Sequence, residues 1–147
     1  MERRKFLTGA AVAGAATSLA APSVAQSKIE MAIVATWPRD FPGLGLPAQR
    51  MAARIQELTD GEIQVTYFAA GEKVGAFDSF DEVASGNSQA YIGADYYWKG
   101  KHPGWAPFTA IPFGLTAGEM DAWTKYAGGQ ELWDELAGEF GLKNFAM

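Results

Sequence analysis

The side chains best suited to contact a ligand lie in two loops that each follow an apolar segment. Trp37 and Phe41 follow the first such segment, and Tyr96, Tyr97 and Trp98 follow a later one. Aromatic rings give a binding site its walls, and tyrosine hydroxyls hydrogen-bond a carboxylate without adding charge. These residues therefore predict a binding site for a small acid. The open alternative is that the same rings only pack against the proline-rich segment beyond them.

The charged residues of the same region have a plainer interpretation. Arg39 would bring positive potential toward an acid, although an arginine in a loop is more often simply solvated. Glu72 and Asp95 are expected to cap helices or to face water. The binding prediction therefore rests on the aromatic residues.

Residues that could perform catalysis are scarce. His102 is the only histidine and lies in a loop rich in proline and glycine, and the chain has no cysteine. A metal centre or a histidine-based triad has almost no residues from which to be built. Asp78, Asp81 and Glu82 are expected to lie on one exposed helix turn, and no glycine-rich phosphate loop is present. The sequence predicts no catalytic residue, no metal ligand, no cofactor and no enzyme.

Hydrophobic periodicity places the two aromatic loops at the ends of strands. The pattern alternates strand and helix, with strands over residues 29–35, 63–68 and 90–94 and helices over residues 47–58 and 78–84. This order predicts an α/β fold in which right-handed crossovers connect a parallel-type sheet with flanking helices. In such sheets ligands bind beyond the carboxyl ends of the strands, which is where both loops fall.

The strand over residues 90–94 also bears on the two tyrosines. Successive side chains of a strand point to opposite faces, so only one of Tyr96 and Tyr97 should face the ligand. The register is not fixed by the sequence, and both assignments remain open, with Tyr97 favoured.

Two helices are expected in the second half of the chain. Thr116 and Glu119 form a capping box, and the helix that they open should bury Met120, Trp123 and Tyr126 before it stops at residues 128–129. A second helix over residues 130–140 should turn four large side chains inward, namely Leu132, Trp133, Leu136 and Phe140. Residues 142–147 resemble the start of a further strand.

The first 25 residues have the pattern of an export signal. A positively charged start leads into a mild Ala/Gly stretch and a small-x-small site that ends at Ala25. Arg3 and Arg4 precede a lysine, a phenylalanine and a leucine, which resembles the twin-arginine (Tat) signal. The apolar stretch is too short and too interrupted for a membrane anchor.

Cleavage after Ala25 would change the charge balance of the chain. It removes three of 12 basic and one of 17 acidic residues, which leaves a net charge of about −7. Nucleic acid is an improbable partner for so acidic a chain, because phosphate backbones are bound by clustered Lys and Arg. A basic patch for a membrane surface is lacking too. We expect a periplasmic protein that does not insert into the membrane.

Three segments taken in order resemble the solute-binding proteins of TRAP transporters, in the branch associated with 2-oxo acids and other small carboxylates. They read Ala-Ala-Gly-Glu at 69–72, Ile-Gly-Ala-Asp-Tyr-Tyr-Trp-Lys-Gly-Lys at 92–101 and Ile-Pro-Phe-Gly-Leu-Thr at 111–116. The resemblance covers essentially the whole chain after the signal, and it is the ordered combination that makes it specific.

The resemblance implies a protein of two α/β lobes that captures a small organic acid and delivers it to the membrane subunits of the transporter. Residues 26–141 then correspond to the first lobe, and residues 142–147 to the start of a strand that crosses into a second lobe. In this family an arginine of the second lobe holds the carboxylate, so the chain is expected to be truncated. A Tat-exported periplasmic enzyme or accessory subunit is the alternative function.

Overall fold

A computed structural model describes residues 28–146. The strands and α-helices are, in order, β1 (Ile29–Ala35), α2 (Gly45–Leu58), β2 (Ile63–Phe68), α3 (Ser79–Ala84), β3 (Ala90–Ile92), α4 (Ala117–Tyr126) and α5 (Gly129–Gly138). Three 3-10 helices lie between them, η1 (Ala76–Asp78), η2 (Asp95–Trp98) and η3 (Pro103–Phe108). The predicted signal, with Arg3, Arg4 and Ala25, lies outside the described residues.

The strands form a parallel sheet in the order β2-β1-β3. Ile29 is opposite Ile63 in the first pair, and Ile33 is opposite Ala90 in the second. The predicted α/β fold with a parallel sheet and flanking helices is confirmed. β3 ends two residues earlier than predicted, because the chain turns at Gly93, where an added Cβ would lie 2.6 Å from the Trp98 ring.

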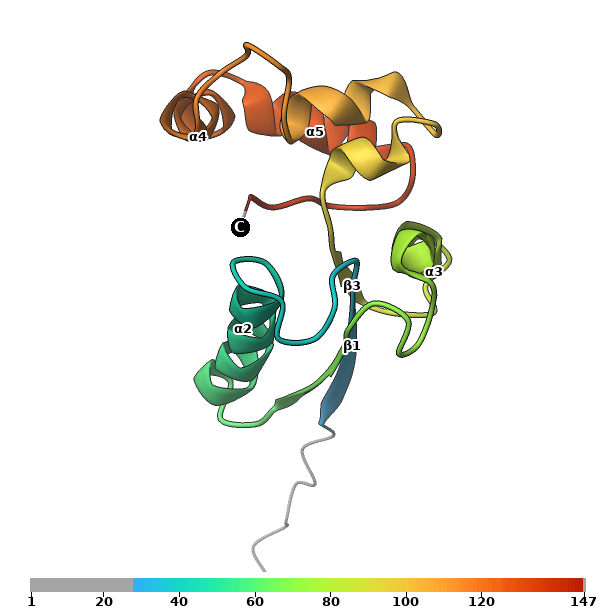
Figure 1. The fold of residues 1–147 in the computed structure, drawn as a ribbon. Helices are drawn as coiled ribbons and strands as arrows, with labels where there is room; N and C mark the ends of the chain where they lie inside the picture. Colours follow the sequence, from blue (N-terminus) through green and yellow to red (C-terminus); the bar gives the residue numbers. More distant parts are fainter. Residues whose placement is uncertain (1–27, 147) are drawn as a thin grey trace, which may run out of the picture.

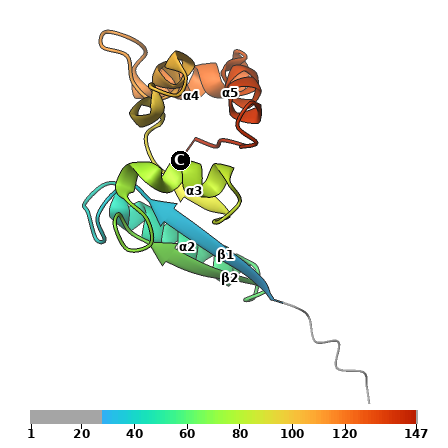
Figure 2. The ribbon, with the colours of Figure 1, turned by 90° about the vertical axis from the view of Figure 1, so that its right-hand side faces the viewer.

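Helices cover the sheet on both faces and at one end (Figure 1). α2 lies on one face and α3 on the other, while α4 and α5 lie beyond the carboxyl ends of the strands, as Figure 2 also shows. Helices and sheet pack through two separate cores. The first lies between the sheet and α2 and consists of Ile33, Ala35, Ala48, Ala52 and Ile92.

The second core joins α3, the two 3-10 helices η2 and η3, and α5. Its buried members are Phe80, Trp98, Trp105, Trp133, Leu136 and Ala137. Phe80 is at its centre, with ring centroids 5.3 Å from both Trp98 and Phe140. This aromatic core attaches the helices at the end of the sheet to the sheet itself.

The capping box at the start of α4 is confirmed. The Thr116 hydroxyl accepts from the Glu119 backbone N–H at 3.4 Å, and the Glu119 carboxylate accepts from the Thr116 N–H at 2.8 Å. The prediction that Tyr126 is buried is wrong, since its side chain is 86% exposed. The buried residue of α4 is Thr124, and a residue two positions further along a helix points to the opposite side.

One inward residue of the last helix was also predicted wrongly. Leu132 is 54% exposed because it lies at the edge of the stripe that α5 buries, which runs through Trp133, Leu136 and Ala137. None of the helices within residues 28–146 is long and apolar enough to cross a membrane.

Residues 142–146 do not form the predicted strand. They run back between the α4–α5 layer and the sheet (Figure 1), where side chains and helix ends hold them. The Leu142 N–H donates to the Ala137 carbonyl at 2.9 Å, and the Gln130 side chain donates to the Asn144 carbonyl at 2.9 Å. A β-strand is defined by hydrogen bonds to a neighbouring strand, whereas these two hydrogen bonds join the segment to α5. The division between a first lobe at 26–141 and a crossing segment at 142–147 stays a prediction.

Candidate ligand-binding site

The loops that follow the three strands meet at one end of the sheet. The Thr36 N–H donates to the Ile92 carbonyl at 3.0 Å, which ties the end of β1 to the end of β3. The Ala70 N–H donates to the Trp37 carbonyl at 3.0 Å, which ties the loop after β2 to the loop after β1. Trp37 therefore lies between the other two loops, where parallel α/β sheets place their ligands.

The loop after β1 supplies two of the predicted site residues. Trp37 is half-buried and packs against the aliphatic core of the sheet and α2. Phe41 is 43% exposed, and its carbonyl accepts from the Gly45 N–H at 2.9 Å, which fixes the loop to the start of α2. Both rings are thus held by backbone that the sheet and α2 position.

The cation of this loop is already paired. The Arg39 Nε donates to Glu72 Oε1 at 2.8 Å, and the terminal nitrogen of Arg39 lies 2.5 Å from Glu72 Oε2. The hydrogen bond from Arg39 is the main reason that the pKa of Glu72 is lowered to about 2, and the same bond raises the pKa of Arg39. Glu72 thus binds Arg39 while its side chain stays exposed, in agreement with the expectation that it faces water.

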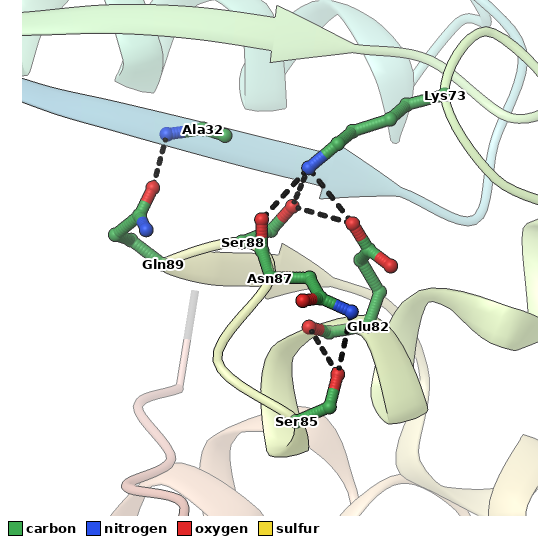
Figure 3. Close-up of polar contacts among 7 residues, drawn as sticks. All are labelled: Ala32, Lys73, Glu82, Ser85, Asn87, Ser88 and Gln89. Atoms are coloured by element: carbon green, nitrogen blue, oxygen red, sulfur yellow. Dashed lines mark hydrogen bonds and ion pairs between the residues drawn. The ribbon is translucent and has the colours of Figure 1, made fainter.

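A lysine of the loop after β2 is paired in the same way (Figure 3). Lys73 Nζ lies 2.8 Å from Glu82 Oε1 and donates to the buried Ser88 hydroxyl at 2.5 Å and to the Asn87 carbonyl at 2.9 Å. The hydrogen bond from Lys73 lowers the pKa of Glu82. Lys73 therefore anchors the turn that precedes β3.

That turn also fixes the register of β3. The Gln89 side chain accepts from the Ala32 N–H at 2.8 Å (Figure 3). The Gln89 N–H donates to the Ala32 carbonyl at 3.1 Å. The glutamine thereby continues the hydrogen bonding between β1 and β3 by one residue. The aromatic loop after β3 starts from a strand held at both ends.

Tyr96 and Tyr97 lie in the 3-10 helix η2 and not on an extension of β3. The expectation of strict alternation between them therefore does not apply. Tyr96 is 38% exposed, whereas Tyr97 is half-buried with its ring centroid 5.2 Å from Phe77 and 4.7 Å from Tyr96. A side-chain hydrogen bond with Tyr97 raises the pKa of Tyr96. The two hydroxyls are neighbours, and Tyr96 is the more accessible residue.

Trp98, the last of the predicted site residues, lies in the aromatic core. It is 4% exposed, its ring packs on Phe80 and Tyr91, and its Nε1–H donates to the Phe77 carbonyl at 2.9 Å. The structure therefore places Trp98 behind the loop, where its ring supports the two tyrosines.

Sequence reasoning missed the buried carboxylate of this loop. Asp95 is 4% exposed, and its Oδ2 accepts from Trp133 Nε1 at 2.6 Å and from Asn144 Nδ2 at 3.2 Å. Burial raises the pKa of Asp95 to about 6. The expectation that Asp95 caps a helix or faces water was wrong. A signal was present, since the residue directly follows an apolar strand and precedes three aromatic residues.

Two grooves lie elsewhere on the described surface. One of about 610 Å³ runs between α2 and β2 and is lined in part by Gln56, Tyr67 and, from the loop after β1, Arg39. The other, of about 350 Å³, is lined in part by Phe108 and Leu132. The predicted aromatic site residues line neither groove. Within residues 28–146, no group of three or more His, Cys, Asp or Glu side chains is arranged to hold a metal ion.

Comparison with known proteins places the chain in a family. The family model of bacterial extracellular solute-binding proteins, family 7 (DctP), matches residues 34–147. A monocarboxylate 2-oxoacid-binding periplasmic protein of Nostoc is 31% identical over 99% of the chain. The chain spans 42% of that relative's length.

Two solved structures of TRAP periplasmic solute-binding proteins have the same fold. The protein of Pseudoalteromonas atlantica, with bound sodium and pyruvate, is 38% identical, and that of Colwellia psychrerythraea, with bound calcium and pyruvate, is 34% identical. Each matches with a TM-score of 0.75 over 78% of this chain and 35% of its own.

These matches confirm the resemblance that the ordered sequence segments predicted. They cover the sheet, its crossover helices and the helices at its carboxyl end. The family and the similar proteins are solute-binding proteins, in agreement with the prediction that the chain is not an enzyme. The chain belongs to the DctP family of bacterial extracellular solute-binding proteins.

Proposed function

We propose that the chain forms one lobe of a periplasmic solute-binding protein that captures a small 2-oxo or 2-hydroxy carboxylate and delivers it to the membrane subunits of a TRAP transporter. The observation that carries this proposal is that the loops holding Trp37, Phe41, Tyr96 and Tyr97 follow neighbouring parallel strands at their carboxyl ends. Two proteins that share this fold over the aligned region hold pyruvate.

The charges of the loops support a divided site. Arg39 and Lys73 are both paired with carboxylates of the chain, so neither side chain is free to bind the carboxylate of a ligand. A carboxylate ligand is bound most strongly by a charged, bidentate partner. In this proposal the charged partner comes from a second lobe, which corresponds to the remaining length of the relatives.

The sheet supports the same division. β3 has a neighbour on one side only among the described strands, so its other edge is open to a further strand. Residues 142–146 run between the sheet and the helices beyond it, in a position to lead into another lobe. Trp37, Phe41, Tyr96 and Tyr97 would then form one wall of a cleft, with Trp98 behind the tyrosines.

Calorimetric titration with pyruvate tests the divided site. The chain of residues 26–147 should bind no more tightly than about millimolar, because an open surface encloses little of a ligand and carries no anchoring charge. The same residues followed by a second lobe should bind at least about tenfold more tightly. Micromolar affinity of residues 26–147 alone would overturn the two-lobe proposal.

The accessible tyrosine should contribute directly to affinity. Tyr96→Phe in the two-lobed protein removes a hydroxyl that hydrogen-bonds a charged acceptor, and should weaken pyruvate binding by about 1.5–3 kcal/mol, or roughly ten- to hundredfold. Tyr126→Phe, on the exposed side of α4, is the matched control and should leave affinity unchanged. If neither Tyr96→Phe nor Tyr97→Phe weakens binding, the loop is structural and the ligand is held elsewhere.

We also propose export to the periplasm through the twin-arginine pathway, with cleavage after Ala25. Arg3 and Arg4 support the pathway, and the small residues before Gln26 support the cleavage site. N-terminal sequencing of periplasmic material should give Gln26 as the first residue. Replacing both arginines by lysine should abolish export, and export that survives this change would contradict the pathway.

A further inference from the structure

Three parts of the chain that are distant in sequence meet at the Asp95 carboxylate. Asp95 begins η2, Trp133 comes from α5, and Asn144 comes from residues 142–146, here called the exit segment. One oxygen, Asp95 Oδ2, accepts from both partners, at 2.6 Å from Trp133 Nε1 and 3.2 Å from Asn144 Nδ2. Asp95 and Asn144 are 4% and 7% exposed, so water competes little for these bonds.

Within residues 28–146, no cation offsets the burial of this carboxylate. The groups that favour its charged form are the neutral donors Trp133 and Asn144. Tyr91 faces it from β3, and burial followed by the charge of Asp95 raises the pKa of that phenol. The nearest ion pair of α5 and the exit segment is that of Lys143 and Asp134, whose charges are engaged with each other.

Asn144 joins the exit segment both to Asp95 and to α5. Its side chain donates to Asp95, while its own carbonyl accepts from Gln130 of α5 at 2.9 Å. Tyr96 follows Asp95 in η2, so the 3-10 helix that carries the buried carboxylate also carries the exposed tyrosine. A buried ionised carboxylate is costly when its partners are neutral.

We propose that Asp95 is a positioning residue that fixes the aromatic loop against α5 and the exit segment, and that this arrangement loosens when its carboxyl loses its proton. Loss of the proton leaves a buried charge whose partners are neutral, so ionisation favours arrangements in which water reaches the carboxylate. The proposal goes beyond the proposed function, because it concerns the chain without ligand and is tested without one.

The indole N–H of Trp133 reports the state of Asp95 directly. In a proton–nitrogen correlation spectrum of the chain, one indole peak should move with a midpoint near pH 6. Loss of that peak in Trp133→Phe assigns it. The Asn144 side-chain amide and the Tyr96 backbone amide should move with the same midpoint, because all three groups are joined through Asp95.

Two variants separate positioning from simple packing. Asp95→Asn keeps the shape and one acceptor oxygen but does not titrate, so the three peaks should stay still across the same pH range. Glu131→Gln removes an exposed carboxylate in the first turn of α5, and should leave the Trp133 midpoint unchanged. A stationary Trp133 peak in the unaltered chain, or one that still titrates in Asp95→Asn, overturns the proposal.

A third variant tests the direction of the coupling. The hydrogen bond from Trp133 lowers the pKa of Asp95, so Trp133→Phe should move the midpoint observed at Asn144 to higher pH. An unchanged or lower midpoint would show that the bond from Trp133 does not stabilise the charged form. Movement of the indole peak without movement at Asn144 and Tyr96 would show that Asp95 titrates but positions nothing.

Discussion

The two cores of the molecule are built on different principles. The core between the sheet and α2 consists of small and medium aliphatic side chains, among them Ile33, Ala48 and Ala52, and follows from strand and helix periodicity. The core between α3, η2, η3 and α5 is aromatic and encloses a buried carboxylate. Strands and one α-helix position the first core, whereas the second combines side chains of two α-helices with those of two short 3-10 helices.

Stacked rings extend the aromatic core toward α4, and together they are called the aromatic half. Phe108 lies between two tryptophans, with ring centroids 5.6 Å from Trp123 and 5.4 Å from Trp133 and interplanar angles of 17° and 5°. Trp133 in turn donates its indole N–H to Asp95. A single set of rings thus connects α4 to the loop of the candidate site, whereas the buried members of the other core are all aliphatic.

The largest expected effect comes from the centre of the aromatic core. Phe80→Ala removes a ring that is 1% exposed and packs on four other aromatic rings, so it should lower the free energy of unfolding by about 3–5 kcal/mol. Phe113→Ala, at a fully exposed ring, is the control and should change it by less than about 0.5 kcal/mol. Denaturant unfolding measures both, and similar losses would contradict the placement of the core.

The buried carboxylate should give the aromatic half a pH dependence. The pKa of Asp95 is raised from 3.8 in the unfolded chain to about 6 in the folded chain. The folded chain therefore keeps a proton that the unfolded chain has lost, and stability falls as pH rises from about 4 through 6. Two pKa units correspond to at most about 3 kcal/mol.

Asp95→Asn removes this titration without removing the side chain. The free energy of unfolding of the variant, minus that of the unaltered chain, should increase between about pH 4 and pH 7. Denaturant unfolding at several pH values measures the difference. Two curves that run parallel across this range would show that Asp95 is ionised as readily in the folded chain as in the unfolded one.

The smallest effect is expected in the aliphatic core. Ile33→Val removes one methylene group from a side chain with 0% exposure, and should cost about 0.5–1.5 kcal/mol. The cost should be independent of pH between about 4 and 8, because the buried members of that core cluster are aliphatic and burial raises the pKa of Tyr67, which packs against it, above its ordinary value. A loss as large as that of Phe80→Ala would remove the distinction between the two cores.

Sequence patterns predicted the aliphatic half well. The strands β1 and β2 match their expected bounds, and α2 begins two residues earlier than expected. Such elements are readable because their periods of two and 3.6 residues repeat over several turns or pleats. The capping box of Thr116 and Glu119 was readable for a similar reason, since both partners lie within one helix turn.

The aromatic half could be predicted only in outline. The exposure of Tyr96 and the burial of Trp98 depend on the 3-10 helix η2, which brings the Trp98 ring back over Gly93. No periodic sequence pattern encodes this contact. The partners of Asp95 lie 38 and 49 residues away. The pairing of Arg39 with Glu72 likewise joins loops 33 residues apart. Local sequence gives no direct signal for such contacts.

Titration of the chain with pyruvate, followed by proton–nitrogen correlation spectra, tests the central claim most directly. The account predicts progressive shifts of the Trp37 indole and of the backbone amides of Tyr96 and Tyr97, without saturation below about millimolar pyruvate. The Trp123 indole, in the groove beside α4, should not move. Shifts confined to Trp123 and its neighbours, or no shifts at either strand-end loop, would contradict the placement of the ligand at the carboxyl ends of the strands.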